Sequence, residues 1–530
     1  MRGRQAADLA VGLAIALLCA APSLPRARAE TAAISPASLP GIGKVSERYQ
    51  SYNVEMLSVT GGAFWKPYGS KADRSADAGR SDQEASAAAK AELYQDRPPL
   101  DLGNARLRKL AAALGPVYVR ISGTWANTTY VTEAEERAAP PPGFSGVLTR
   151  ALWRSVVDFA KAVNAEIVTS FAISDGTRDA TGVWTAGQAR RLIDATRAMG
   201  GRIAAAEFMN EPTLAVMNGA PAGYDAARYG RDFAIFHAFA RQAAPDMLIL
   251  GPGVLGGSVG PQGAVDVDAP LLTARDLLMA SQPATLDAVS YHFYGALSPR
   301  CSGSHTSADE ALSEHWLGRT DGALAFTRLL RDQLASGKPI WLTETADAAC
   351  GGTPWAPTFL DSFRYLDQLG RLARQGVEVV IHNTLVWSDY GLLDEGSFRP
   401  RPNYWAALLW RRFMGSTVLD TGIAIREGLH LYAHCLRGTS GGVALLAINT
   451  SRTRSGGIRF PAGSEARRAT MSAPALEASQ VLLNGHALAL DARDDLPDLD
   501  DEPLEGDAIE LAPATITFIT IPKAGNRSCR

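Results

Sequence analysis

Several features that mark common classes of protein are absent from this sequence. Its 530 residues contain 52 Lys plus Arg and 55 Asp plus Glu, so the net charge is only −3. No excess of positive charge favours nucleic acid or an anionic membrane. After the first expected strand, Gly61-Gly62 leads into Ala63-Phe64-Trp65, without the third glycine or the lysine of a phosphate-binding loop. A nucleotide site is therefore not expected.

Metal-binding motifs are also missing. The chain has only 8 His and 5 Cys, with no Cys-x-x-Cys pair, and neither His292 nor His382 belongs to a His-Glu-x-x-His motif. We therefore expect no metal and no other cofactor.

Long hydrophobic runs are confined to the N terminus. Arg2 and Arg4 precede the apolar stretch 9–21, and Ala27-Arg28-Ala29 forms a small-residue cleavage site. The stretch is shorter than the ~20 residues of a membrane-spanning helix. We expect residues 1–29 to be a signal peptide, and the mature protein to be secreted or periplasmic, free of the membrane and monomeric.

Export would place the four later cysteines in an oxidising compartment, where they allow three disulfide connectivities. Cys301 and Cys350 each follow an expected strand, whereas Cys435 and Cys529 both lie in the last quarter of the chain. This distribution favours the pairs 301–350 and 435–529. Four buried free thiols are the alternative.

Short runs rich in apolar and β-branched residues alternate eight times with stretches of helical periodicity. The alternation predicts parallel strands joined by helices, and the count of eight favours a closed (β/α)8 TIM barrel over an open doubly wound sheet. The expected strands are 53–59, 117–121, 167–171, 204–208, 248–250, 288–291, 339–342 and 377–381. The expected helices are 107–114, 148–163, 185–199, 228–243, 271–280, 323–334, 359–374 and 408–413.

The pattern changes after the last of these helices. Short alternating strands at 429–436, 442–449, 457–460, 480–483 and 515–521 predict an antiparallel β-sandwich. We therefore expect a linker at 30–45, a catalytic barrel at 46–412 and a sandwich domain at 413–530. The acidic run 491–507 lacks the spacing of a calcium loop and is interpreted as a solvated loop.

Glutamates stand at the carboxyl ends of two expected strands, where the catalytic groups of such barrels lie. Glu211 follows the fourth strand in Asn210-Glu211-Pro212, and Glu344 ends the seventh in Thr343-Glu344-Thr345. Strands four and seven face each other across the barrel. Paired carboxyls suit glycoside hydrolysis, with Glu211 as the acid and Glu344 as the nucleophile. Each glutamate alone is more often a salt-bridge partner.

Other strand ends add residues to this expected site. Asn210 is placed to meet a sugar hydroxyl, and His292 and Tyr294 to hold the carboxylate of Glu344, although a lone histidine is as often part of a core. The first strand adds Glu55 and then Trp65, the second adds Arg120 and then Trp125, and the eighth is followed by Trp387 and Tyr390. These residues supply charge and stacking surfaces, or simply core.

These motifs resemble glycoside hydrolase family 79, the heparanase and β-glucuronidase family. The likeness covers residues 52–530. It rests on 210–212, on 343–345 followed by Gly351-Gly352, and on the Tyr-x-x-x-Asp-Glu-x-x-Phe-x-Pro-x-Pro run that begins at Tyr390. The chain looks like a bacterial heparanase-like member that is not cleaved into two chains, since no long insertion follows the second strand.

The resemblance implies a retaining β-glucuronidase with Glu211 as acid/base and Glu344 as nucleophile. The backbone at Gly351 and Gly352 and the hydroxyl of Tyr390 match the groups that hold a uronate carboxylate. Cys435 and Cys529 fall where heparanase-like members carry a disulfide in the sandwich, and Cys350 beside the glycine turn suggests a bridge to Cys301.

The expected substrate is a uronic-acid-containing polysaccharide such as heparan sulfate, with Lys66, Arg399 and Arg401 as contacts for sulfates or as solvated charges. The alternatives are an exo-acting β-glucuronidase on small or plant-type glucuronides, a barrel glycosidase with another sugar, and a carbohydrate-binding protein without catalysis. Endo or exo action depends on loops that the sequence does not define.

Overall fold

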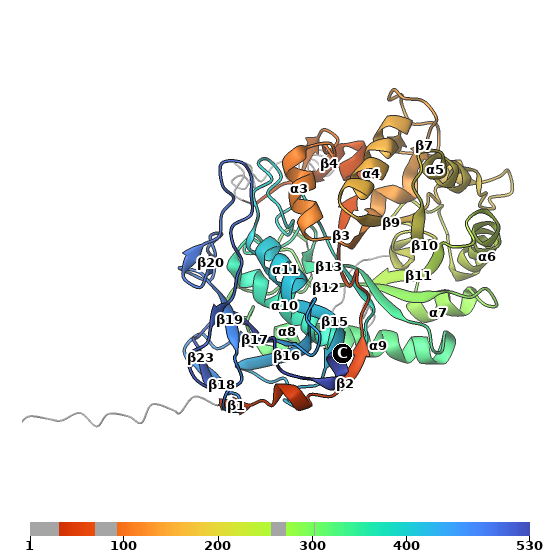
Figure 1. Cartoon of the computed structure of the whole chain (residues 1–530). Helices are drawn as coiled ribbons and strands as arrows, with labels where there is room; N and C mark the ends of the chain where they lie inside the picture. The colour runs from red at the N-terminus through yellow and green to blue at the C-terminus, as the bar shows by residue number, and fades with distance from the viewer. Residues whose placement is uncertain (1–30, 69–92, 256–271, 302) are drawn as a thin grey trace, which may run out of the picture.

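The computed structural model describes residues 31–68, 93–255, 272–301 and 303–530 (Figure 1). The expected signal peptide at 1–29 lies outside these residues. Among the described residues, no helix is long and apolar enough to cross a membrane.

Eight parallel strands form a closed barrel, which confirms the expected (β/α)8 architecture. Seven of the expected strands are found with shifted ends. The first differs more, because it spans Gln50–Glu55 and residues 56–60 form helix α1. In chain order the strands are β3 (Gln50–Glu55), β6 (Val117–Ser122), β9 (Ala165–Ser170), β10 (Ile203–Glu207), β11 (Leu248–Leu255), β12 (Ala288–Leu297), β13 (Ile340–Ala349) and β14 (Val379–His382).

Eight helices correspond to the expected ones and join or follow these strands. They are α3 (Ala105–Ala113), α4 (Arg150–Ala162), α5 (Gly187–Ala198), α6 (Ala226–Ala243), α7 (Ala274–Ala280), α9 (Arg319–Leu334), α10 (Phe359–Arg374) and α11 (Pro402–Phe413). Capping residues explain several starts, since the side chains of Asn104, Thr149 and Asp225 accept hydrogen bonds from the first turns of α3, α4 and α6.

Shorter elements lie at the loops and ends. They are α1 (Met56–Thr60), α8 (Glu314–Leu317), η1 (Pro36–Ser38), η2 (Thr124–Thr128), η3 (Asp175–Thr177), η4 (Pro212–Leu214), η5 (Arg527–Cys529) and the strand pairs β4 (Gly62–Trp65) with β5 (Tyr94–Arg97) and β7 (Thr129–Val131) with β8 (Gly146–Leu148).

The barrel strands alternate between two environments, as the two-residue period of a strand requires. Val119 and Ile121 of β6 join the large core under the helices, whereas Arg120 between them belongs to the other face. A separate apolar cluster includes Ala205, Ala288 and Trp341. Farther along the same inner rows the residues become polar, so the barrel carries its charged groups toward the carboxyl ends of its strands.

Two sheets form the expected C-terminal sandwich. The larger, antiparallel sheet consists of β2 (Gly41–Lys44), β15 (Met414–Leu419), β16 (Leu429–Leu436), β17 (Val443–Asn449), β24 (Thr515–Ile521), β19 (Arg467–Ser472), β20 (Leu482–Leu483), β21 (His486–Ala487) and β22 (Glu502–Pro503). The smaller contains β1 (Thr31–Ala33), β18 (Gly456–Arg459) and β23 (Ala508–Leu511). β15, β19, β22 and β23 are strands that the sequence pattern did not predict.

The larger sheet is buried on both faces. Leu431 and Leu445 pack with Ile458 of the smaller sheet, whereas Tyr432 and Leu446, one residue along, belong to the core of the barrel. Gly370 allows α10 to pack closely against Tyr432 of β16, since a Cβ added at Gly370 would lie 2.4 Å from the Tyr432 ring. Figure 1 shows β16 and β17 beside α10 and α11.

The expected linker at 30–45 is wrong. β1 pairs with β18 and β2 pairs with β15, so these residues belong to the C-terminal sheets. Pairing satisfies backbone groups that an isolated segment would leave to water. The acidic run 491–507 is also more than solvated: Asp494 and Asp495 pair with Arg106 and Lys109 of α3, both at 2.5 Å.

Candidate active site

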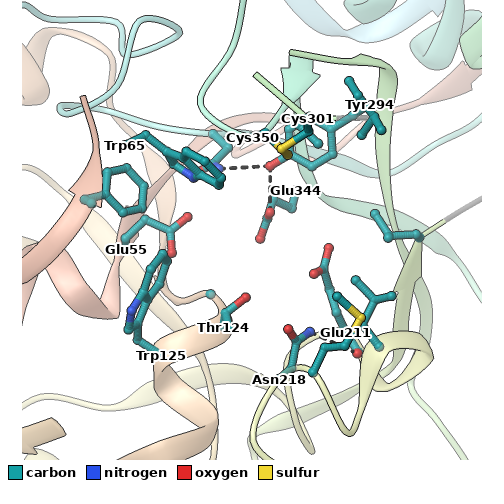
Figure 2. Close-up of a pocket in the computed structure, with 18 of the residues that line it drawn as sticks. Glu55, Trp65, Thr124, Trp125, Glu211, Asn218, Tyr294, Cys301, Glu344 and Cys350 are labelled. Carbon is teal, nitrogen blue, oxygen red and sulfur yellow. Dashed lines mark hydrogen bonds between the residues drawn. A yellow bond between two sulfur atoms is a disulfide. The ribbon is translucent and has the colours of Figure 1, made fainter. Parts of the chain in front are cut away.

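A pocket of about 480 Å³ opens at the carboxyl ends of the barrel strands (Figure 2). Its wall contains Glu55 at the end of β3, Glu211 after β10 and Glu344 in β13. Parallel barrel strands bring their carboxyl ends to one face, so these distant residues meet. The large rings and apolar side chains of the wall are Phe64, Trp65, Tyr94, Trp125, Leu214, Met217, Leu255, Tyr294, Leu297 and Tyr390.

Glu211 has a left-handed backbone conformation, with φ at 45°, which a residue other than glycine adopts only when its surroundings enforce it. Asn127 fixes the preceding residue from both sides: it donates to the Asn210 carbonyl at 2.9 Å and accepts from the Asn210 N–H at 2.8 Å. Asn218 donates to the Glu211 carbonyl at 3.4 Å. These contacts direct the Glu211 carboxyl into the pocket (Figure 2).

Glu211 and Glu344 are brought together, as expected. One carboxyl oxygen of each and a ring nitrogen of His292 all lie within 4.8 Å of one another. His292 Nδ1 is 3.0 Å from Glu211 Oε1 and 3.8 Å from Glu344 Oε2. His292 is completely buried, so it contacts both carboxyls from behind rather than from the pocket.

Arg120 is the positive charge around which these groups gather. Its Nη1 donates to Glu344 Oε2 at 2.8 Å, and its Nη2 donates to Glu207 Oε2 and to Asn210 Oδ1, each at 2.8 Å. A buried guanidinium requires such partners. Asn210 is therefore held against Arg120 and is not among the residues of the pocket wall.

Glu207 was not assigned a role from the sequence. It is fully buried and also accepts hydrogen bonds from Ser290 at 2.8 Å and from Thr343 at 2.7 Å. Although burial raises its pKa, the positive charges of Arg120 and His292 hold that pKa below its ordinary value. A charged residue inside an apolar strand was the available signal, because such a residue must find a partner.

The Glu344 carboxylate is held in its charged form. Burial alone would raise its pKa, but the charges of His292 and Arg120 and a 2.6 Å hydrogen bond from the Tyr294 hydroxyl hold the pKa below its ordinary value. Asn383, whose role was not anticipated, donates to Tyr294 at 2.9 Å and keeps that hydroxyl directed at Glu344. An ionised, oriented carboxylate is what a nucleophile requires.

Glu55 has the opposite electrostatic character. Burial and the nearby negative charge of Glu344 raise its pKa well above the ordinary value. Its Oε2 has no hydrogen-bond partner among the residues that the structure describes, and Gly123 leaves room for it, since a Cβ there would lie 1.7 Å away. The pocket therefore combines a charged Glu344 with a neutral Glu55.

Both expected disulfides are present, Cys301–Cys350 and Cys435–Cys529. Cys350 lines the pocket, whereas the expected Gly351 and Gly352 are not among the residues of its described wall. A Cβ on Gly351 would lie 2.8 Å from Trp65, and one on Gly352 would lie 3.1 Å from Tyr390. The two glycines thus allow Trp65 and Tyr390 to approach the turn closely.

Arg401 is not available for a sulfate. It is mostly buried, and its Nη1 donates to the carbonyls of Ser388 and Asp389 at 2.6 and 2.8 Å. Neither Arg399 nor Lys66 is among the residues that form the described pocket wall.

The donor atoms of Glu211, His292 and Glu344 are close enough to suggest a metal site. Arg120, however, already supplies a positive charge to this group, at 2.8 Å from Glu344 and 3.2 Å from His292 Nε2. A divalent cation here would face the repulsion of the buried guanidinium.

Comparison with known proteins places this site in a family. Residues 98–370, just over half of the chain, match the model described as "Glycosyl hydrolase family 79, N-terminal domain". Heparanase-like protein 1 of Arabidopsis thaliana is 26% identical over 81% of this chain and 86% of its own length. Baicalin-beta-D-glucuronidase of Scutellaria baicalensis is 34% identical over 34% of this chain and 36% of its own length.

The fold is shared with a solved structure of much lower sequence similarity. A 4-O-alpha-L-rhamnosyl-beta-D-glucuronidase from Fusarium oxysporum superposes with a TM-score of 0.62 at 11% identity, covering 92% of this chain and all of that one. Together with the family match, the paired glutamates at the mouth of a TM barrel identify the chain as a glycoside hydrolase that belongs to glycosyl hydrolase family 79.

Proposed function

We propose that this protein is a retaining β-glucuronidase in which Glu344 is the nucleophile and Glu211 the acid/base. The observation that carries the proposal is the spacing of the two carboxyls. One oxygen of each carboxyl lies within 4.8 Å of the other, a close approach that agrees with the roughly 5–5.5 Å between the carboxyl groups of retaining enzymes.

In the first step Glu344 attacks the anomeric carbon and forms a glycosyl ester, while Glu211 gives its proton to the leaving oxygen. In the second step Glu211 takes a proton from water, which attacks the same carbon and releases Glu344. Arg120 and Tyr294 keep Glu344 ionised and oriented for the attack. Glu211 is oriented by its contact with His292.

We assign the uronate carboxylate to the turn at residues 350–352 and the hydroxyl of Tyr390. The described pocket wall contains no Lys or Arg, which supports binding of that carboxylate by backbone N–H groups and hydroxyls. Neutral donors can do so, and they discriminate against sugars that lack the group. Similarity to a heparanase-like protein and to a glucuronidase supports a uronate substrate.

For the group on the leaving side, a small or apolar aglycone is favoured over a sulfated glycan such as heparan sulfate. Trp125, Leu214, Met217 and Leu255 line the pocket, and Met217 is 56% exposed. An exposed apolar side chain beside a catalytic pocket is typical of a binding surface. A densely sulfated chain would instead require cationic contacts. The paired carboxyls argue against a binding protein without catalysis.

We further propose that residues 46–412 form the catalytic unit, that 413–530 supports it together with the strands at 31–44, and that the protein is exported as a monomer. The pairing of β2 with β15 supports the inclusion of the N-terminal strands.

Product analysis tests the function. Purified protein and its Glu344→Gln variant are incubated with heparan sulfate and with an aryl β-glucuronide. We expect only the wild type to release glucuronate from the aryl conjugate, with retained anomeric configuration by NMR. Shortened heparan chains would overturn the preference for a small aglycone, and inactivity on both substrates would overturn the proposed function.

A further inference from the structure

Asp347 is a buried carboxyl that the mechanism above does not use. It lies on β13, three residues after Glu344, and is completely buried. Its Oδ2 accepts hydrogen bonds from the N–H and the hydroxyl of Thr353, at 2.8 and 2.7 Å. Its Oδ1 has no hydrogen-bond partner within the described part of the chain. Buried polar atoms without partners are rare and costly.

Asp347 stands directly behind the turn that we assign to the uronate carboxylate. Residues 350–352 all have positive φ, at 63°, 87° and 88°. A Cβ on Gly352 would lie 3.3 Å from Asp347 Oδ1 and 3.1 Å from the Tyr390 ring, so Gly352 separates the two side chains. The Tyr390 ring lines the pocket. Only Gly352 and the Tyr390 ring would therefore separate a charge on Asp347 from the pocket.

The neighbouring cations lie beside other carboxylates. Arg364 of α10 forms a two-pronged ion pair with Asp361, at 2.6 and 2.7 Å. Arg300 lies 3.6 Å from Asp389, and its Nη1, near Gly351, has no hydrogen-bond partner among the described residues. Neither guanidinium donates a hydrogen bond to Asp347 within the described part of the chain, so the charge of Asp347, when present, is poorly compensated.

The other titratable groups near Asp347 add no positive charge. Tyr68, Tyr294 and Tyr390 have pKa values raised, mainly by burial, so these hydroxyls are neutral. Glu344, on the same strand, is anionic.

Burial, with a contribution from the negative charge of Asp361, raises the pKa of Asp347 to about 7, against the opposing effects of Arg364 and Thr353. The carboxyl therefore changes its charge near neutrality, whereas a uronate remains anionic.

We propose that Asp347 is a positioning residue that must be protonated for tight binding of a uronate, and that its ionisation weakens the binding of anionic but not of neutral substrates. The proposal rests on the proposed function, because it requires the uronate carboxylate to lie against the turn. Protonated Asp347 leaves the turn as a neutral donor surface. Ionised Asp347 places a negative charge behind the substrate carboxylate.

The expected signature separates KM from kcat. As the pH rises through about 7, KM for an aryl β-glucuronide should increase by about tenfold, since like charges repel across a poorly solvated layer. A second effect on kcat from the catalytic carboxyls is measured separately at saturating substrate. Binding of an aryl β-glucoside, which has no carboxylate, should not show this dependence.

Asp347→Asn tests the proposal, because asparagine retains an acceptor for Thr353 but cannot ionise. Values of KM and kcat are measured from about pH 5 to about pH 9. We expect a KM without the rise seen in the wild type. Thr353→Val is the second variant: it removes a hydrogen bond that stabilises the charged form, so the rise in KM should move to higher pH. Thr353→Ser, which keeps the hydroxyl, is the control.

Two results overturn the assignment of Asp347 while leaving the glucuronidase function intact: an unchanged KM profile in Asp347→Asn, or an unshifted midpoint in Thr353→Val. If Asp347→Asn does not fold, the pH midpoint of the rise in KM in Thr353→Val decides whether the assignment of Asp347 holds. Failure of the wild type to cleave glucuronides at any pH overturns the function itself, so the two failures are distinct.

Discussion

Charged side chains gather both at the mouth of the barrel and at the junction between the barrel and the C-terminal sheet. The two clusters differ in how fully their charges are paired with opposite charges. The junction cluster consists of Glu314, Asp321, Asp367, Arg371 and His430. Each of the three guanidinium nitrogens of Arg371 has its own carboxylate partner at 2.6 Å, and His430 Nδ1 lies 2.6 Å from Asp367. His430 Nε2 also lies 3.2 Å from Glu314 Oε2, so each charged group of this cluster has an oppositely charged neighbour without a ligand.

The mouth cluster consists of Glu55, Glu207, Glu211, Glu344, Arg120 and His292. Four carboxyls share one arginine and one histidine, Oε2 of Glu55 lacks a hydrogen-bond partner in the described part of the chain, and three of the carboxyls face the pocket. The two clusters therefore differ in how their charges are paired and in whether carboxyls face a pocket, and not in whether charge is buried.

The largest effect is expected from neutralising the mouth carboxylates. Glu344→Gln should lower kcat by roughly 10³-fold or more, because the amide cannot form the glycosyl ester. Glu211→Gln should lower kcat by roughly 10²–10⁴-fold for an alkyl glucuronide, which needs a proton on its leaving oxygen. Both are measured as kcat at saturating substrate, with the variants' folding checked by circular dichroism.

The leaving group supplies the control for that assignment. Nitrophenolate leaves without being protonated. The first step with a nitrophenyl glucuronide should therefore be nearly unaffected in Glu211→Gln and remain blocked in Glu344→Gln. Equal losses of kcat/KM, which reports the steps up to formation of the glycosyl ester, on the two substrates in Glu211→Gln would contradict its role as the acid.

A smaller effect, on stability and not on kcat, is expected at the junction. The negative charge of Asp367, with hydrogen bonds to Asp367 and Glu314, raises the pKa of His430 from 6.5 to about 9 against the effect of burial. Its stabilisation is complete below pH 6.5 and is lost as the pH rises through 9. His430→Asn should remove about 3 kcal/mol of this pH-dependent stability, measured by urea unfolding at several pH values.

His434 on the same strand is the matched control. Burial lowers its pKa to about 4, so it is neutral throughout this pH range. His434→Asn should leave the pH dependence of stability above pH 6.5 unchanged. A large fall in kcat for folded His430→Asn would mean that the junction is not merely structural.

The comparison also shows what the sequence could and could not predict. Alternating strands and helices predicted the barrel, because that alternation is a local pattern in the sequence. Carboxyls at strand ends predicted Glu211 and Glu344, because eight parallel strands that close into a barrel bring their carboxyl ends to one face. The pairing of β1 and β2 with β18 and β15 could not be predicted, since it joins segments about 370 to 430 residues apart. Nor could the packing of Gly351 and Gly352, which depends on where Trp65 and Tyr390 approach the turn.

The smallest effect is expected from Glu55→Gln, which applies the same substitution as Glu344→Gln within the same pocket. Because burial and the charge of Glu344 raise the pKa of Glu55 well above its ordinary value, the residue is already neutral, and an amide reproduces its shape and charge. The amide supplies N–H donors in place of the hydroxyl, so kcat/KM should fall by no more than about tenfold. A loss as large as that of Glu344→Gln would mean that Glu55 acts as an anion, and that the partition of this cluster into one charged and one neutral carboxyl is wrong.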